Sequence, residues 1–198
     1  MSPIQAMERS YSALKQMLRE GHYAPGARLE ANRLAEELGV SMTPVRDVLH
    51  RLVGERLVEA SSGEGFHVPR HSEAGLRDLY EWHSALILIA IRTTRIAGDL
   101  GIEPNFASTA DLTQWTFEQI ASGAPNREVR AAVASAGDRL HPFRMLEPQV
   151  LEPVIGELEE LMNRSSGQTS AIRRYHLRRM RAVGTLLEAQ NVEPGSRL

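Results

Sequence analysis

Cysteine is absent from the 198-residue sequence, which excludes a disulfide framework, a zinc–thiolate site and a cysteine nucleophile. The absence fits a reducing compartment, so we expect a cytoplasmic protein. No apolar run approaches the roughly 20 residues that span a bilayer, and the first ten residues lack the charged-then-apolar layout of a secretory signal peptide. We therefore expect no contact with a membrane.

A strong excess of charge of either sign is also missing, because 23 Lys and Arg face 25 Asp and Glu, for a net charge of -2. Binding to nucleic acid therefore cannot rest on bulk charge and needs a local basic surface. With 42% hydrophobic and 24% charged residues, the composition is that of a globular protein rather than a disordered or fibrous one. The length allows one large domain or two small ones.

The first forty residues contain two amphipathic helical patterns, one over 3–21 and a shorter one over about 30–38. Gly39 follows the second pattern, where a helix commonly ends in a left-handed residue. Ser41 is a suitable N-cap for a third helix, and Pro44 stands in the first turn of that helix, where its missing N–H costs little. These spacings predict three short helices, with a tight turn between the second and the third.

A hairpin pattern follows the third helix. Residues 57–60 and 66–68 are strand candidates, and the small and polar residues 61–65 between them include two glycines. The order of helix, helix, four-residue turn, helix and hairpin is that of a winged helix-turn-helix. The polar segment 69–72 then forms a short linker, and we place the domain boundary there.

Beyond the linker the sequence predicts helices only, so the domains are a winged helix-turn-helix over 1–70 and a helical domain over 71–198. The predicted fold class is mainly α, an N-terminal winged helix-turn-helix followed by an all-α helical bundle. We expect Pro142, Pro148 and Pro153 to interrupt the chain, the last of them opening a helix that ends at Met162. The other predicted helices cover 73–98, 111–120, 127–140 and 168–190.

Four segments of the N-terminal domain resemble the GntR family of bacterial transcription regulators. They are Pro-Gly-Ala-Arg-Leu at 25–29, Leu-Ala-Glu-Glu-Leu-Gly-Val-Ser-Met-Thr-Pro-Val-Arg-Asp-Val-Leu at 34–49, Gly-Glu-Arg-Leu-Val at 54–58 and Gly-Glu-Gly-Phe-His-Val at 63–68. The resemblance covers about residues 4–69, a third of the chain, and its elements match in order. A chance winged helix of another family is the alternative.

The resemblance implies that Ser41, Thr43, Arg46 and Gly63 contact operator DNA. A recognition helix enters the major groove with its N-terminal residues first, and an arginine there can bind the O6 and N7 atoms of a guanine, worth about 1–3 kcal/mol of discrimination. Hydroxyl groups at a helix N-terminus can donate hydrogen bonds to phosphate oxygens. The alternative for Arg46 is a structural salt bridge to Asp47 or Glu37.

The complete set of predicted DNA-binding residues is Asn32, Arg33, Ser41, Met42, Thr43, Arg46, Ser62 and Gly63. Asn32 or Arg33 can hold the DNA backbone from the start of the second helix. Met42 is a departure, because many members of the family carry arginine at this position. One contact is therefore missing, and the affinity or the operator sequence differs accordingly.

The second domain looks like the FadR-type (FCD) subfamily, in its helical pattern and in the Asp-Leu-Tyr-Glu sequence at 78–81. The resemblance implies a helical domain that forms a dimer and binds a small acid or a divalent metal through an aspartate, a histidine one turn later and two further histidines. The candidates for this effector or metal site are His83, Asp138, His141 and His176. The ligand set is incomplete, because Gly137 stands four residues before His141 and no histidine follows His176. The alternative for His83 and His176 is a core histidine hydrogen-bonded to a neighbour.

Two further patterns in this domain are a cluster of arginines and an uninterrupted apolar run. Five arginines crowd the last predicted helix, namely Arg173, Arg174, Arg178, Arg179 and Arg181. We favour a solvated face, with glutamates of the preceding helix opposite, over an anion site. The apolar run 85–91 needs cover on every side, from its own bundle or from a second subunit.

The sequence thus predicts a transcriptional regulator of GntR type, a repressor that binds a pseudo-palindromic operator as a homodimer. A small-molecule effector in the helical domain would act through the linker at 69–72. One alternative keeps the DNA-binding dimer without an effector. The other is a small helical enzyme, against which no Ser-His-Asp order, phosphate-binding glycine loop or HExxH motif appears.

Overall fold

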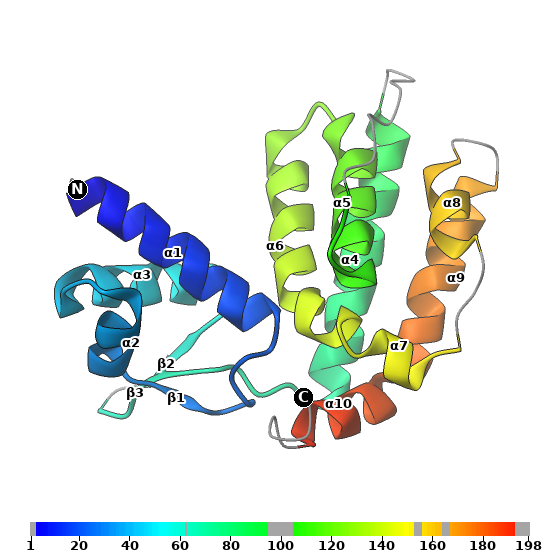
Figure 1. Cartoon of the computed structure of the whole chain (residues 1–198). Coiled ribbons are helices and arrows are strands. Elements are labelled where there is room, and N and C mark those ends of the chain that lie inside the picture. Colours follow the sequence, from blue (N-terminus) through cyan, green and yellow to red (C-terminus); the bar gives the residue numbers. More distant parts are fainter. Residues whose placement is uncertain (1–2, 62, 95–104, 153–155, 164–166, 193–198) are drawn as a thin grey trace. The chain divides into compact units, whose positions relative to one another are not determined.

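The chain divides between His71 and Ser72 into two compact units (Figure 1). The second unit runs from Ser72 to Ala189, and the first contains the other residues. The computed structural model describes residues 3–61, 63–94, 105–152, 156–163 and 167–192. The predicted DNA-binding residue Ser62 lies outside these ranges.

The first unit has the predicted winged helix-turn-helix order. Its elements are α1 (Pro3–Arg19), β1 (Arg28–Leu29), α2 (Ala31–Leu38), α3 (Met42–Gly54), β2 (Glu59–Ser61) and β3 (Gly65–His67). The strands form an antiparallel sheet in the order β1-β3-β2, with Arg28 opposite His67 and Ala60 opposite Phe66. Strand β1 was not predicted, because two residues are too few to show an alternating pattern.

The turn between α2 and α3 forms as the sequence predicts. Gly39 adopts the left-handed conformation, with φ 65°, and its N–H bonds the carbonyl oxygens of the last turn of α2. Ser41 is the N-cap of α3 in an extended conformation, but its side chain makes no capping hydrogen bond. The side chains of Leu34, Val45 and Leu49 fill the space between the two helices.

Polar contacts fix α1 against the C-terminal end of α3. The hydroxyl of Tyr11 donates to Glu55 Oε1 at 2.7 Å, and Lys15 Nζ donates to Glu55 Oε2 at 2.9 Å. The guanidinium of Arg51 lies over the Tyr11 ring, 3.5 Å from its centroid, and bonds Glu8 at 3.0 Å. These contacts use the far end of α3, so they leave its N-terminal turn exposed.

Arg56 is strained in a way that allows a stability prediction. Its φ of 60° is the single positive value among the described non-glycine residues. The left-handed conformation costs about 1–2 kcal/mol for a residue with a Cβ atom. Glycine avoids this cost, but the larger conformational entropy of its unfolded chain cancels part of the stability gained. We expect Arg56→Gly to raise the free energy of unfolding by about 0.5–1 kcal/mol in urea titrations. Arg56→Ala, which keeps the Cβ atom, is the control, and equal stability of the two variants would refute the argument.

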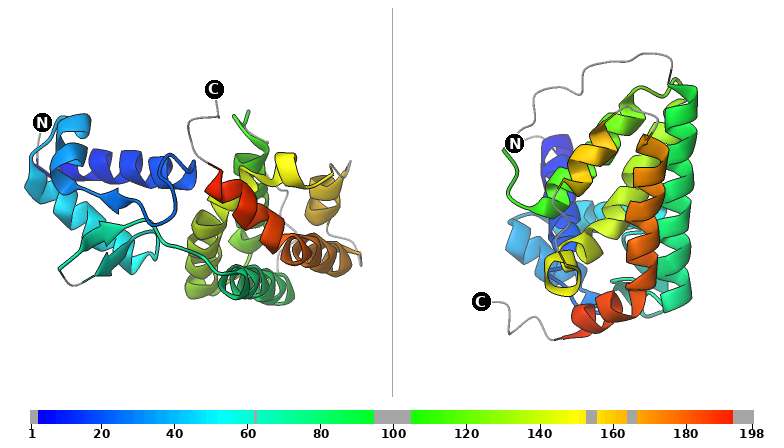
Figure 2. Two further views of the ribbon diagram at one scale, coloured as in Figure 1. Left: turned by 90° about the horizontal axis from the view of Figure 1, so that it is seen from below. Right: turned by 90° about the vertical axis from the view of Figure 1, so that its right-hand side faces the viewer.

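Every regular element in the described part of the second unit is a helix, which confirms the predicted fold class. Its elements are α4 (Glu73–Thr93), α5 (Thr109–Ser122), α6 (Arg127–Arg144), α7 (Glu147–Val150), α8 (Glu157–Met162), α9 (Gln168–Arg181) and α10 (Val183–Asn191). Helix α4 packs on α5, α6 and α9, and α8 packs on α9 (Figures 1 and 2). The core between them includes the fully buried side chains of Leu76, Tyr80, Ile87, Leu140 and Ile172.

The sequence-based prediction was wrong about the effect of two prolines, Pro142 and Pro148. Helix α6 continues through Pro142 to Arg144 instead of ending at Leu140. Pro142 stands in the last turn, so it removes a single N–H bond, and the burial of Leu140 and Phe143 on one face holds the turn together. Pro148 stands in the first turn of α7 and interrupts nothing, and Pro153 lies outside the described residues.

Two other predicted helices are shorter than expected. Helix α4 ends at Thr93, because Thr94 is extended with ψ 119°, and residues 95–98 of the prediction lie outside the described residues. The predicted helix over 168–190 is two helices, α9 and α10, which meet at Ala182 with φ -99° and ψ 7°. The apolar spacing continues across Ala182, so periodicity alone did not show the break.

Candidate functional site

The N-terminal turn of α3 is an exposed surface with one free cation. Ser41, Met42, Thr43 and Arg46 are all exposed, Met42 to 47%. No ion pair or hydrogen bond engages the Arg46 guanidinium within the part of the chain that the structure describes, so the alternative of a structural salt bridge is not formed there. The turn is therefore free to bind a ligand through side chains and unpaired backbone N–H groups.

The other predicted DNA contacts lie on α2 and at the tip of the hairpin. Asn32 and Arg33 are exposed in the first turn of α2. Gly63 is exposed, with φ 81°, at the tip between β2 and β3. Arg28, which sequence reasoning missed, is exposed on β1, and a Cβ atom at Gly65 would lie 3.7 Å from its Nε atom. A cationic side chain thus lies beside Gly65, where β3 follows the turn of the hairpin.

The second unit contains a buried chain of polar side chains that begins at two histidines. His83 Nδ1 lies 2.8 Å from His176 Nε2, and His176 Nδ1 lies 2.7 Å from the carbonyl oxygen of Ile172. Burial lowers the pKa of His176 to about 3, and burial and the charge of Arg144 lower that of His83 well below its usual value. Both rings are therefore neutral, and each donates from Nδ1 and has its lone pair on Nε2.

Arg144 continues this chain. Its Nη2 lies 3.5 Å from His83 Nε2, and its Nη1 donates to Gln114 Oε1 at 2.7 Å. The side chain is 1% exposed, and its Nε has no hydrogen-bond partner. No carboxylate pairs with Arg144 in the described residues. The guanidinium is therefore a buried cation whose partners are neutral.

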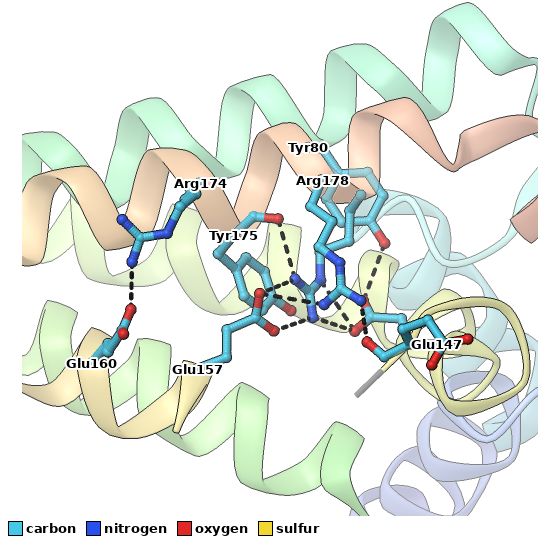
Figure 3. A network of polar contacts seen from close by, with 9 residues as sticks. Tyr80, Glu147, Glu157, Glu160, Arg174, Tyr175 and Arg178 are labelled. Carbon is cyan, nitrogen blue, oxygen red and sulfur yellow. Dashed lines mark hydrogen bonds and ion pairs between the residues drawn. The ribbon is translucent and has the colours of Figure 1, made fainter. Parts of the chain in front are cut away.

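Arg179, by contrast, is buried with two counter-charges, Glu147 and Glu157, which are labelled in Figure 3. Its Nη2 lies 2.9 Å from Glu147 Oε2 and 2.8 Å from Glu157 Oε2, and its Nε and Nη1 make further bonds to the same carboxylates. The guanidinium lies 3.4 Å from the centroid of the Tyr175 ring. The prediction of a solvated arginine face was therefore wrong for Arg179, although the exposed pair of Arg174 with Glu160 agrees with it.

A cavity of about 410 Å³ lies beside both buried arginines. Its lining comes from α5, the end of α6, α7, α8 and α9. Arg144, Arg179, Glu147 and Glu157 are part of this lining. The apolar part is formed by Leu112, Pro148, Leu151, Leu158 and Met162. The volume suits a small organic molecule.

The predicted metal ligands do not converge. His83 and His176 contact each other, whereas His141 Nε2 lies 3.0 Å from Asp111 Oδ1. Asp138 is buried, at 8% exposure. Among the described residues no group of three or more His, Asp or Glu side chains is arranged to hold a metal ion.

The histidine lone pairs that would bind a metal ion are already engaged, and the space for a carboxylate ligand is occupied. The lone pair of His176 Nε2 accepts from His83, and that of His83 Nε2 points to the Arg144 cation. A Cβ atom at Gly137 would lie 2.4 Å from Gln114 Oε1, so the Gln114 amide fills the place of a carboxylate four residues before His141. The residues present do not fit a divalent cation, and the structure favours hydrogen-bonded core histidines.

Comparison with known proteins identifies the first unit. The model of "Bacterial regulatory proteins, gntR family" matches residues 6–68. This segment covers the three helices and the hairpin described above. Residues 6–68 form a gntR-family domain. The predicted resemblance is thereby confirmed for the part of the chain that supported it.

Curated relatives match the same end of the chain. The HTH-type transcriptional regulator McbR of Escherichia coli K12 is 46% identical over 68 residues, 34% of this chain and 29% of the relative. The Nta operon transcriptional regulator of Aminobacter aminovorans is 37% identical over 71 residues, 36% of this chain and 34% of the relative. The chain thus matches about a third of the length of these two relatives. Both relatives are named as transcriptional regulators.

Two solved structures share the fold over both units. Escherichia coli McbR/YncC has a TM-score of 0.62 and 21% identity, covering 93% of this chain and 98% of the other. A putative GntR regulator from Rhodococcus sp. RHA1 has a TM-score of 0.66 and 17% identity, covering 92% and 98%. The gntR-family domain is therefore followed by a helical unit of a known fold. No described helix is long and apolar enough to cross a membrane.

Proposed function

We propose that this chain is a transcriptional repressor that binds operator DNA through its gntR-family domain. The observation that supports it is the unpaired Arg46 on the exposed first turn of α3, inside the segment that matches the family. In this proposal Arg46 binds a guanine in the major groove, and Ser41 and Thr43 bind phosphates beside it. Asn32, Arg33, Arg28 and Gly63 add contacts to the DNA backbone.

The test is binding of the purified protein to the DNA upstream of its own gene, over a series of salt concentrations. We expect Arg46→Ala to weaken specific binding about tenfold to a hundredfold, because a bidentate contact to guanine contributes about 1–3 kcal/mol. The logarithm of the wild-type affinity should fall linearly with the logarithm of the salt concentration.

Arg77→Ala is the matched control for this test. Arg77 is an exposed arginine of the helical unit, so its loss changes the net charge equally without touching the proposed contacts. Equal losses in both variants, or binding that ignores the DNA sequence, would exclude the proposed recognition by Arg46.

A second part of the proposal is a homodimer formed through α4. Asp78, Trp82, Ala85, Ile89 and Arg92 follow one another at steps of four, three, four and three residues, so they lie on one stripe of the helix. Trp82 is 50% exposed and Ile89 is 43% exposed, although both are large and apolar. An exposed apolar stripe of this kind is typical of a protein interface.

Charge along the stripe favours a second copy as the partner. If two copies of α4 cross antiparallel at Ala85, Trp82 meets Ile89 of the other copy and Asp78 meets Arg92. Each contact then occurs twice, as a two-fold axis requires. A two-fold dimer in turn matches a pseudo-palindromic operator with two half-sites.

The third part is control by a small ligand in the cavity of the second unit. A ligand that binds more tightly to one arrangement of the dimer shifts the protein toward it, and the linker at 69–72 would pass this change to the DNA-binding domains. The supporting observation is the cavity of about 410 Å³. If no ligand alters operator affinity, the alternative of a helical unit that only dimerises gains support.

A further inference from the structure

Met42 is an exposed apolar side chain between polar neighbours. It is the first residue of α3, it stands between Ser41 and Thr43, and it is 47% exposed. Met7 and Met17 pack against the core of the first unit, but Met42 is not among the described side chains that do so. Of the large apolar side chains that are exposed in the described chain, it is the one inside the segment that matches the gntR family. The Met42 side chain is therefore available to a ligand of this surface.

Met42 lies beside Arg46 on α3. The two exposed residues are four positions apart, so their Cβ atoms are about 5–6 Å from each other on one face of the helix. Successive bases of a DNA strand are about 3.4 Å apart along the helix axis, so this separation corresponds to about one or two base pairs. If Arg46 binds a guanine in the major groove, Met42 therefore reaches a base pair close to that guanine.

The chemistry of methionine narrows what it can recognise there. The side chain has no hydrogen-bond donor, and its sulfur is only a weak acceptor. In the major groove guanine, adenine and cytosine present polar edges, and a methionine against such an edge displaces water without replacing the hydrogen bonds. Among the four unmodified bases, thymine alone carries an apolar group in this groove, the methyl group at C5. The flexible thioether adapts readily to an apolar partner of this kind.

We propose that Met42 is a specificity-determining residue that contacts the C5-methyl group of a thymine close to the guanine bound by Arg46. The inference rests on the proposed binding of operator DNA and adds a second base to the one assigned there. The contact removes apolar surface of both partners from water, which favours thymine over cytosine at this position. Met42 thus replaces the polar contact that the sequence predicts to be missing with an apolar one.

The test begins with the selection of binding sites by the full-length protein from a pool of random-sequence DNA, so it requires no known operator. We expect the wild-type sites to contain a guanine with a thymine about one or two base pairs away, on either strand. Arg46→Ala should lose the preference for the guanine. Met42→Ala should keep the guanine and lose the preference for the thymine.

Uracil then isolates the methyl group, because it carries a hydrogen atom at C5 where thymine carries the methyl. Each thymine of the selected site is replaced in turn by uracil. At the proposed thymine we expect the wild-type affinity to fall about threefold to tenfold, the range expected for one buried methyl group. Met42→Ala and Met42→Gln, the second of which keeps a similar length, should bind both versions equally. Met42→Leu, which remains apolar, should retain most of the difference.

The melting temperatures of these variants should equal that of the wild type, because Met42 is exposed and stands apart from the core. A large decrease would give Met42 a structural role and overturn the inference. So would a thymine preference that persists in Met42→Ala, equal wild-type binding to thymine and uracil at every position, or an equal effect of uracil on the wild type and Met42→Ala.

Failure of the inference is distinct from failure of the proposed function. If the wild type selects a guanine through Arg46 but no thymine that depends on Met42, the inference alone is refuted. If the wild type selects no DNA sequence at all, the proposed function fails, and the inference fails with it.

Discussion

Replacing Arg179 by alanine is expected to lower the free energy of unfolding by about 3–5 kcal/mol. The guanidinium donates hydrogen bonds to the carboxylates of Glu147 and Glu157 and covers the Tyr175 ring. Its removal leaves two neighbouring carboxylates in a partly buried site with no cation, so their mutual repulsion adds to the lost hydrogen bonds. Urea titration of the full-length protein measures the loss as a lower midpoint with an unchanged slope.

Arg174→Ala is the matched control on the same helix. Arg174 pairs with Glu160 at the surface, so its loss should cost no more than about 1 kcal/mol. A triple variant in which Arg179 becomes methionine and both glutamates become glutamine should recover most of the stability lost in Arg179→Ala, because no buried charge remains unpaired. A loss in Arg179→Ala as small as that in Arg174→Ala would show that the buried cluster contributes little.

The first unit was predictable from sequence because its decisive features are local. Gly39 and Ser41 mark the ends of consecutive helices, and apolar spacing fixes which faces are buried. The exposed first turn of α3 follows directly from that spacing, and the resemblance to the GntR family identified Arg46 in this turn as a candidate. Strand β1 was not predictable, because it exists only through its pairing with β3.

The polar centre of the second unit was not predictable in the same way. The sequence-based prediction did not single out Arg144, and it assigned Arg179 to a solvated face, although both follow buried residues at helical spacing, Leu140 by four and Ile172 by seven. Periodicity does not show which side chain each arginine contacts. Arg179 meets carboxylates from α7 and α8, whereas Arg144 meets an amide of α5 and no carboxylate in the described chain. That difference, between an arginine neutralised by two carboxylates and an arginine with neutral partners, arises only in the packed bundle.

Ile89→Glu is expected to convert the proposed dimer to a monomer and to weaken operator binding about 10²- to 10⁴-fold. In the antiparallel crossing the new carboxylate would face the Trp82 ring of the second copy twice, without a cation to pair with it. The loss of affinity follows because the two half-sites are then no longer bound by one particle, and the effective concentration of the second domain is lost. Light scattering after gel filtration measures the mass, and titration with full and half operators measures the affinity.

Val192→Glu makes the same change at an exposed valine that follows α10, outside the stripe, and should alter neither mass nor affinity. The direction of the crossing has its own test. Asp78→Arg and Arg92→Asp should each weaken the dimer by placing like charges opposite each other, and the double variant should restore it, because the pair is then re-formed with reversed signs. If Ile89→Glu remains dimeric, the copies meet through another surface. If it becomes monomeric but the charge reversal restores nothing, the stripe is the interface and the antiparallel register is wrong.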